Sequence, residues 1–221
     1  MKRLMVGLII VALAPQRALG GTPPGNTCTQ LPVSTISVRL NTLDPYAARH
    51  ARAIQSIIDQ TWTALGVQFR WTTDNTTTPL WIHLSSHAPR SAAPDALALV
   101  RFKSGVAEPA VLVFVDSVTN WVLRSEAERF RTTTRLQTPV IGDAADLTAI
   151  ALGYVAAHEI GHYLLGSKRH SKVGLMQATY EHVENLRAPR NMFLDEASRH
   201  RLDARLREGE TCRAAVLAAA R

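Results

Sequence analysis

The stretch His158-Glu159-Ile160-Gly161-His162 decides how the rest of this 221-residue chain is interpreted. It has the form H-E-x-x-H, and residues four apart stack on one face of an α-helix, so two imidazoles can bind one cation. Glu159 is rotated by about 100° from His158 and reaches beside the ion. Imidazole nitrogen suits zinc, and a catalytic zinc keeps three protein ligands and an open position for water. The carboxylate would then take the proton of that water.

The motif lies near the end of a segment that is apolar on almost every face. This segment covers residues 147–165, Asp143 or Asp146 can cap its start, and Gly166 is placed as a helix C-terminal glycine. Such a helix lies in the interior of a protein, where two histidines and a glutamate are costly to bury without a partner. The setting therefore favours a metal site over the structural alternative of satisfied core histidines.

The segments around this helix indicate one more helix on each side and a group of strands. Residues 45–65 carry apolar side chains at helical spacing after Asp44, which can serve as the N-cap. Residues 191–208 predict a last amphipathic helix, and residues 120–135 are predicted to be mostly loop. Four apolar runs predict strands that follow the first helix, namely 67–71, 80–84, 96–102 and 110–115.

The residues after the helix carry a resemblance to a known family. The chain continues Ser167-Lys168-Arg169-His170 and later Gly174-Leu175-Met176. Here it resembles the metzincin superfamily of zinc endopeptidases, and its matrixin-like members most of all. The resemblance implies His158, His162 and His170 as zinc ligands, Glu159 as general base, Gly166 as the turning residue, and Met176 in a Met-turn beneath the metal. It also implies an α+β, metzincin-like fold with a mixed twisted sheet of four or five strands, an N-terminal helix, a buried active-site helix and a C-terminal helix.

The third histidine departs from the family spacing. The family string is H-E-x-x-H-x-x-G-x-x-H, but here Gly166 falls one residue late and His170 two residues late. Gly166 can adopt a left-handed conformation, and three linking residues can span about 10 Å back to the metal. An alternative makes His170 a surface residue of a basic loop. A carboxylate of Glu181 or Glu184 would then be the third ligand, as in thermolysin-like enzymes.

Two further features concern the substrate. Tyr180 could stabilise the oxyanion, as a tyrosine near the Met-turn does in some relatives, although its spacing differs from theirs. The run at 110–115 is either an edge strand, against which an extended peptide could align by main-chain hydrogen bonds, or a fully paired interior strand.

The N-terminus has the outline of a secretory signal peptide. Lys2 and Arg3 precede an uncharged apolar run, and small residues allow cleavage near Gly20. We expect residues 1–20 to be removed and residues 21–221 to form a single catalytic domain, exported to the periplasm or the extracellular medium. No later segment is apolar enough to span a bilayer.

The two cysteines lie near the two ends of the mature chain. In an exported protein, Cys28 and Cys212 are expected to form a disulfide. The alternative is that the Cys28 thiolate caps the metal site and keeps the enzyme latent, which would leave Cys212 unpaired in an oxidising compartment.

The composition is that of an ordinary globular protein, with 46% hydrophobic and 19% charged residues. It excludes disordered, collagen-like and coiled-coil proteins. The net charge is +7, but removing Lys2, Arg3 and Arg17 with the signal peptide leaves 22 basic against 18 acidic residues, a surplus of +4. This surplus has no Lys/Arg run, so it favours general attraction to acidic surfaces over nucleic-acid binding.

These features together predict a secreted, monomeric, zinc-dependent endopeptidase that acts on peptide or protein substrates. Three alternatives remain open. They are an exported zinc hydrolase of cell-wall peptides, a gluzincin-type peptidase with a glutamate as third ligand, and a non-catalytic module in which the histidines hold metal passively.

Overall fold

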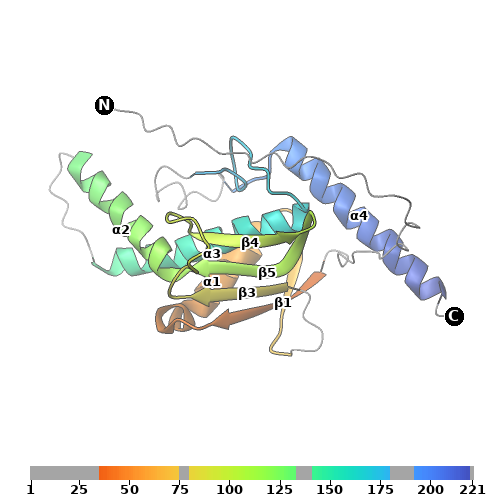
Figure 1. The fold of residues 1–221 in the computed structure, drawn as a ribbon, viewed down its shortest axis with the longest axis horizontal. Coiled ribbons are helices and arrows are strands. Elements are labelled where there is room, and N and C mark those ends of the chain that lie inside the picture. The colour runs from red at the N-terminus through yellow and green to blue at the C-terminus, as the bar shows by residue number, and fades with distance from the viewer. Residues whose placement is uncertain (1–34, 75–79, 133–140, 180–191, 220–221) are drawn as a thin grey trace.

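The structure is a computed structural model that describes residues 35–74, 80–132, 141–179 and 192–219. Within these ranges the elements follow in the order β1, α1, β2, β3, β4, β5, α2, α3 and α4 (Figure 1). The fold is α+β with a mixed sheet, as predicted. The predicted signal peptide at 1–20 lies outside the described residues.

A sheet of five strands forms the centre of the fold. Its spatial order is β2 (Gln68–Trp71), β1 (Thr35–Thr42), β3 (Leu80–Ser85), β5 (Val106–Phe114) and β4 (Ala98–Lys103). The first four run parallel to one another, and β4 is antiparallel to β5. Of the two alternatives for residues 110–115, the edge strand is wrong, because β5 has a neighbour on each side. The strand at this edge is β4.

Strand β1 is absent from the predicted elements. Its apolar residues Ile36, Val38 and Leu40 alternate with polar ones, as in a strand with one buried face. Ile36 and Val38 are fully buried, while Arg39 and Asn41 lie on the opposite face. The alternating pattern was therefore present in the sequence but short. In the sheet β1 lies between β2 and β3 and pairs parallel with both.

Three predicted helices are confirmed. Helix α1 (Pro45–Thr63) begins where Asp44 accepts a hydrogen bond from the Ala47 N–H at 2.9 Å. Helix α3 (Ile141–Leu165) carries the H-E-x-x-H motif, and α4 (Glu196–Ala219) follows it. No described helix is long and apolar enough to cross a membrane.

Helix α2 (Val115–Thr132) occupies a segment predicted to be mostly loop, and that prediction is wrong as far as Thr132. Val118, Val122 and Ser125 are buried and lie three or four residues apart, which gives the helix an inward face. On its outer side Arg129 pairs with Glu126 and Arg131 with Glu128, at 3.1 and 3.4 Å. The polar composition of the segment concealed this periodicity.

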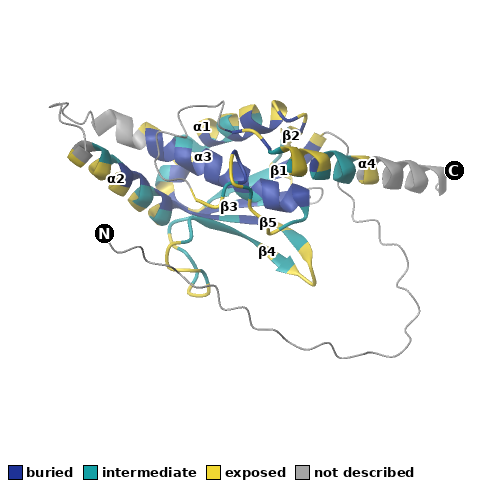
Figure 2. Ribbon diagram, turned by 90° about the horizontal axis from the view of Figure 1, so that it is seen from above, coloured by how far each residue is buried: buried dark blue, intermediate teal, exposed yellow. Residues whose placement is uncertain are grey.

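Helices α1 and α3 cover one face of the sheet, as Figures 1 and 2 show. They pack closely at Gly153, where an added Cβ would lie 2.7 Å from the side chain of Ile57. Trp62 donates a hydrogen bond from its indole nitrogen to the Ala157 carbonyl at 3.2 Å. These contacts hold α3 against α1 on this face of the sheet.

Candidate metal centre

Three histidine rings converge at the C-terminal half of α3. His158 and His162 project from the helix and are 8% and 6% exposed, while His170 comes from the following loop and is exposed. One nitrogen from each ring lies within 4.8 Å of the other two, and the Nε2 atoms of His162 and His170 are 3.2 Å apart. Two ligands of a tetrahedral zinc at about 2.0–2.1 Å are separated by about 3.3 Å. This group could hold a metal ion.

Backbone carbonyls orient the two helical rings. The Nδ1 of His158 donates a hydrogen bond to the Leu175 carbonyl, and the Nδ1 of His162 donates one to the Ser167 carbonyl, both at 2.7 Å. A carbonyl oxygen can only accept, so each Nδ1 carries the proton and each Nε2 keeps a lone pair for a cation. Such outer contacts fix the tautomer and the ring plane of metal-binding histidines.

Gly166 turns the chain back toward the two helical rings. Its φ is +56°, in the left-handed region, and the Ser167 N–H donates to the His162 carbonyl at 3.1 Å. Arg205 of α4 covers the glycine, with its guanidinium carbon 3.3 Å from the position of an added Cβ. The chain reverses direction at this glycine, and the longer spacing still brings His170 to the other two histidines.

Met176 lies in a tight segment directly beneath the motif. Its sulfur packs against Gly161 so closely that an added Cβ would collide with it, and Met176 itself is 1% exposed. The Met176 carbonyl accepts a hydrogen bond from the Ser171 N–H at 2.8 Å. The preceding residue, Leu175, supplies the carbonyl for His158. Met176 therefore packs beneath the helix that carries His158 and His162, and the described residues show no contact that would make it a ligand.

Burial changes the titration of the site. Burial, followed by the nearby His162, lowers the pKa of His158 to about 3, and burial also lowers the pKa of His162 and of His170. All three rings are therefore neutral at pH 7, which is the form that binds a metal. Burial raises the pKa of Glu159 to about 7, although a hydrogen bond from the Val100 N–H lowers it.

A pocket of about 550 Å³ opens beside the three histidines. Its walls come from the start and middle of β4, from α2, from α3 and from the segment after Met176. In the antiparallel pair, the Phe114 N–H donates to the Leu97 carbonyl, so the backbone groups of Ala98 and Val100 face away from β5. The hydrogen bond from Val100 to Glu159 agrees with this. Within the described ranges no strand pairs with this edge of β4, and the edge runs past the motif.

Several predicted residues cannot be placed. Tyr180, Glu181 and Glu184 lie outside the described residues, as does Cys28. Cys212 belongs to α4, but its side chain is not described, so the disulfide stays a prediction.

Sequence reasoning did not find the carbonyls of Ser167 and Leu175, because any residue supplies a carbonyl. It also did not find the pocket residues Trp121 and Arg124, because α2 was predicted as loop. The helical spacing of the buried valines of α2 would have given that signal.

No protein-family model matches this chain, and no curated protein matches it. The likeness to metzincins therefore rests on the motif residues themselves.

Proposed function

We propose that this protein is an exported, zinc-dependent endopeptidase of metzincin-like type. The observation that carries the proposal is the convergence of three neutral imidazoles beside Glu159, in a pocket along the free edge of β4. Imidazole nitrogens suit zinc, and three of them leave a fourth position for water. The turn at Gly166 and the packing of Met176 on Gly161 agree with the motif resemblance.

The residues of this chain can be assigned roles in hydrolysis. Zinc held by His158, His162 and His170 would lower the pKa of a water ligand to about 7 and polarise the scissile carbonyl. Glu159 accepts the proton of the attacking water and passes it to the leaving amine. A pKa raised to about 7 suits both steps, because a general acid–base works best near the pH at which it operates.

The outer edge of β4 offers a binding site for the substrate. An extended peptide can add to a strand edge by main-chain hydrogen bonds, here with the outward groups of Ala98 and the outward carbonyl of Val100, whose N–H donates to Glu159. The peptide bond beside Glu159 is then the one cleaved. The same geometry suits a hydrolase of cell-wall peptides, which differs only in the peptide it accepts.

The proposal is tested by Glu159→Gln, which removes the base and leaves all three imidazoles. We expect the purified wild type to bind one zinc ion and to cleave a broad peptide library. Glu159→Gln should keep the zinc, with hydrolysis reduced by about two to four orders of magnitude. Glu128→Gln, an exposed glutamate on α2, is the matched control and should retain wild-type turnover.

Three outcomes would separate the alternatives. Near-normal turnover of Glu159→Gln would remove Glu159 from the mechanism. Zinc binding without hydrolysis of any peptide would favour the non-catalytic module. Unchanged zinc content in His170→Ala would indicate that the third ligand is Glu181 or Glu184 instead of His170.

A further inference from the structure

The pocket beside the metal centre carries positive charge at two places. Lys168 and Arg124 both line it, from the loop after α3 and from α2 respectively. The one acidic lining residue apart from Glu159 is Asp95, just before β4. Apart from Glu159 and the histidines, the lining residues therefore carry two positive charges and one negative charge.

Lys168 is held in position at the end of β4. Its ammonium nitrogen lies 5.1 Å from the centroid of the Phe102 ring, within the range of a cation–π contact. Phe102 also lines the pocket. Within the described ranges no carboxylate forms an ion pair with Lys168, so its charge is available to a ligand.

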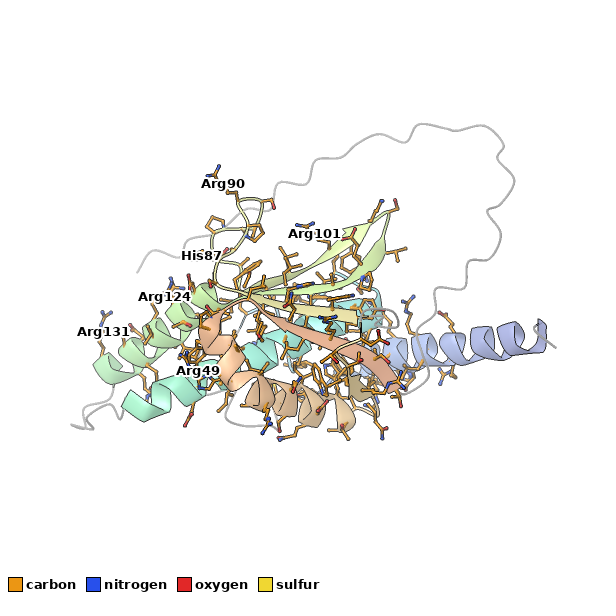
Figure 3. The ribbon with its side chains drawn as sticks, turned by 90° about the horizontal axis from the view of Figure 1, so that it is seen from below. Arg49, His87, Arg90, Arg101, Arg124 and Arg131 are labelled. Carbon is orange, nitrogen blue, oxygen red and sulfur yellow. The ribbon has the colours of Figure 1, made fainter. Side chains whose placement is uncertain are left out.

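Arg124 differs from the other arginines of α2. Arg129 and Arg131 form ion pairs with glutamates three residues away on the same helix. Arg124 follows Trp121 by one helical turn, and both line the pocket. Among the residues that the structure describes, no acidic side chain pairs with Arg124. Figure 3 shows Arg124 and Arg131 along the same helix.

These two cations lie near opposite ends of the part of β4 that lines the pocket. Helix α2, which carries Arg124, starts directly after Phe114, whose N–H donates to the Leu97 carbonyl just before β4. Lys168 lies over Phe102 near the other end of β4. Val100, which bonds Glu159, lies between these two ends, so a peptide extended along β4 would pass one cation on each side of Glu159. Strands rise about 3.3 Å per residue, so the two contacts would be made by different substrate residues.

We propose that this cleft selects peptides with acidic side chains flanking the scissile bond, one bound by Lys168 and another by Arg124. The inference rests on the proposed peptidase function and names its substrate class. Asp95 weakens the attraction at its own end and disfavours a second acidic residue there. The net charge of +4 that remains once residues 1–20 are removed also attracts such substrates from a distance.

The test compares matched peptides that differ only in acidic or neutral residues around the cleaved bond. For the zinc-loaded wild type, kcat/KM should be higher for the acidic peptide, and the preference should shrink in high salt. Lys168→Gln and Arg124→Gln should each lower the acidic-to-neutral ratio about threefold to tenfold. Lys168→Glu should reverse the preference at its position.

Two control variants, Arg101→Gln and Arg131→Gln, remove one positive charge each, as the test variants do, but at residues that do not line the pocket. Arg101 lies on β4 between two pocket residues, and Arg131 lies on α2 (Figure 3). Both should leave the ratio unchanged. Zinc content is measured for every variant, because a ratio is compared only between fully loaded enzymes.

The outcome separates this inference from the proposed function. If the wild type cleaves acidic and neutral peptides equally, or if the control variants shift the ratio as much as Lys168→Gln, the inference is overturned. If no peptide is cleaved, the peptidase proposal fails. In that case the binding of labelled peptides to Glu159→Gln, measured by fluorescence anisotropy, tests the inference independently of hydrolysis. Tighter binding of the acidic peptide, lost in Lys168→Glu, supports it, and equal binding overturns it.

Discussion

The two halves of the candidate metal centre are held in different ways. His158 and His162 lie on a helix in the core, and a carbonyl fixes each ring. His170 is exposed on a loop, and within the described chain no residue accepts a hydrogen bond from its Nδ1. The helical half is therefore preorganised by packing, whereas the loop half depends on how its backbone is anchored.

That anchoring lies in the segment that passes under the motif. The Leu175 N–H donates to the Phe193 carbonyl at 2.8 Å, which ties the segment to the start of the chain leading into α4. Gly174 sits at this crossing with φ +78°. The comparison gives two predictions. The loop half should lose its structure when its backbone is forced apart at Gly174, and the helical half should lose zinc affinity when its packing on Met176 is disturbed.

The largest effect should come from Gly174→Ala. An added Cβ would collide with the Phe193 carbonyl, and the left-handed φ is unfavourable for alanine. We expect the free energy of unfolding to fall by about 2 to 5 kcal/mol, from left-handed strain of about 1 to 2 and overpacking of about 1 to 3 kcal/mol. Urea denaturation of the metal-free protein measures it.

Gly105→Ala is the matched control for this substitution. Its φ is +83°, but nothing lies within 4 Å of an added Cβ, so only the strain of about 1 to 2 kcal/mol is expected. Equal losses in the two variants would mean that the crossing at Phe193 does not constrain the loop half.

A smaller effect, on zinc affinity more than on stability, should follow Gly161→Ala. Its Cβ would collide with the Met176 sulfur, but methionine is flexible and alanine gains about 1 kcal/mol of helix propensity over glycine. Displacing Met176 shifts the neighbouring Leu175 carbonyl that orients His158. We expect zinc affinity to fall about tenfold, measured by competition with a chelator.

Gly153→Ala, on the same helix, separates packing from ligand orientation. Its Cβ would meet the branched side chain of Ile57 instead, away from the histidines. This variant should lose stability and keep the wild-type zinc affinity. If Gly161→Ala also kept that affinity, Met176 would have no part in orienting the site.

The same division explains what the sequence could predict. The helical half was readable, because H-E-x-x-H places its ligands by helical geometry alone and the apolar composition of α3 predicts burial. Met176 was found only through the family resemblance, whereas Gly166 was already placed as a helix C-terminal glycine and took from the resemblance only its role as turning residue. His170 remained open between ligand and surface residue, because a loop conformation does not follow from periodicity.

The pocket was the least predictable part. Its walls combine β4, α2 and the loop after α3, and contacts between segments so far apart in the chain leave no local pattern. The Ser-, Thr- and Arg-rich composition of α2 hid a helix whose inward face holds Val118 and Val122. With α2 assigned as loop, neither Trp121 nor Arg124 could be assigned to the cleft.

The smallest predicted effect is the pH dependence of zinc binding. Three imidazoles with the ordinary pKa near 6.5 would lose about fiftyfold in zinc affinity between pH 7.5 and 6.0, because protons compete for each nitrogen. Here the pKa values of all three rings are lowered, so the rings stay neutral to a lower pH and the affinity should fall by less than that. The residual change should come from His170, the most exposed of the three.

Calorimetry on Glu159→Gln measures this effect without interference from the Glu159 carboxyl, whose pKa is raised to about 7. Zinc binding at pH 6.0 should release fewer protons from the three rings than the two or so that unperturbed imidazoles would release, because the pKa of each ring is lowered. A release of two protons would show that the rings are hydrated like surface histidines before the metal binds. The contrast between a preorganised helical half and a solvated loop half would then be lost, because the site would assemble around the metal.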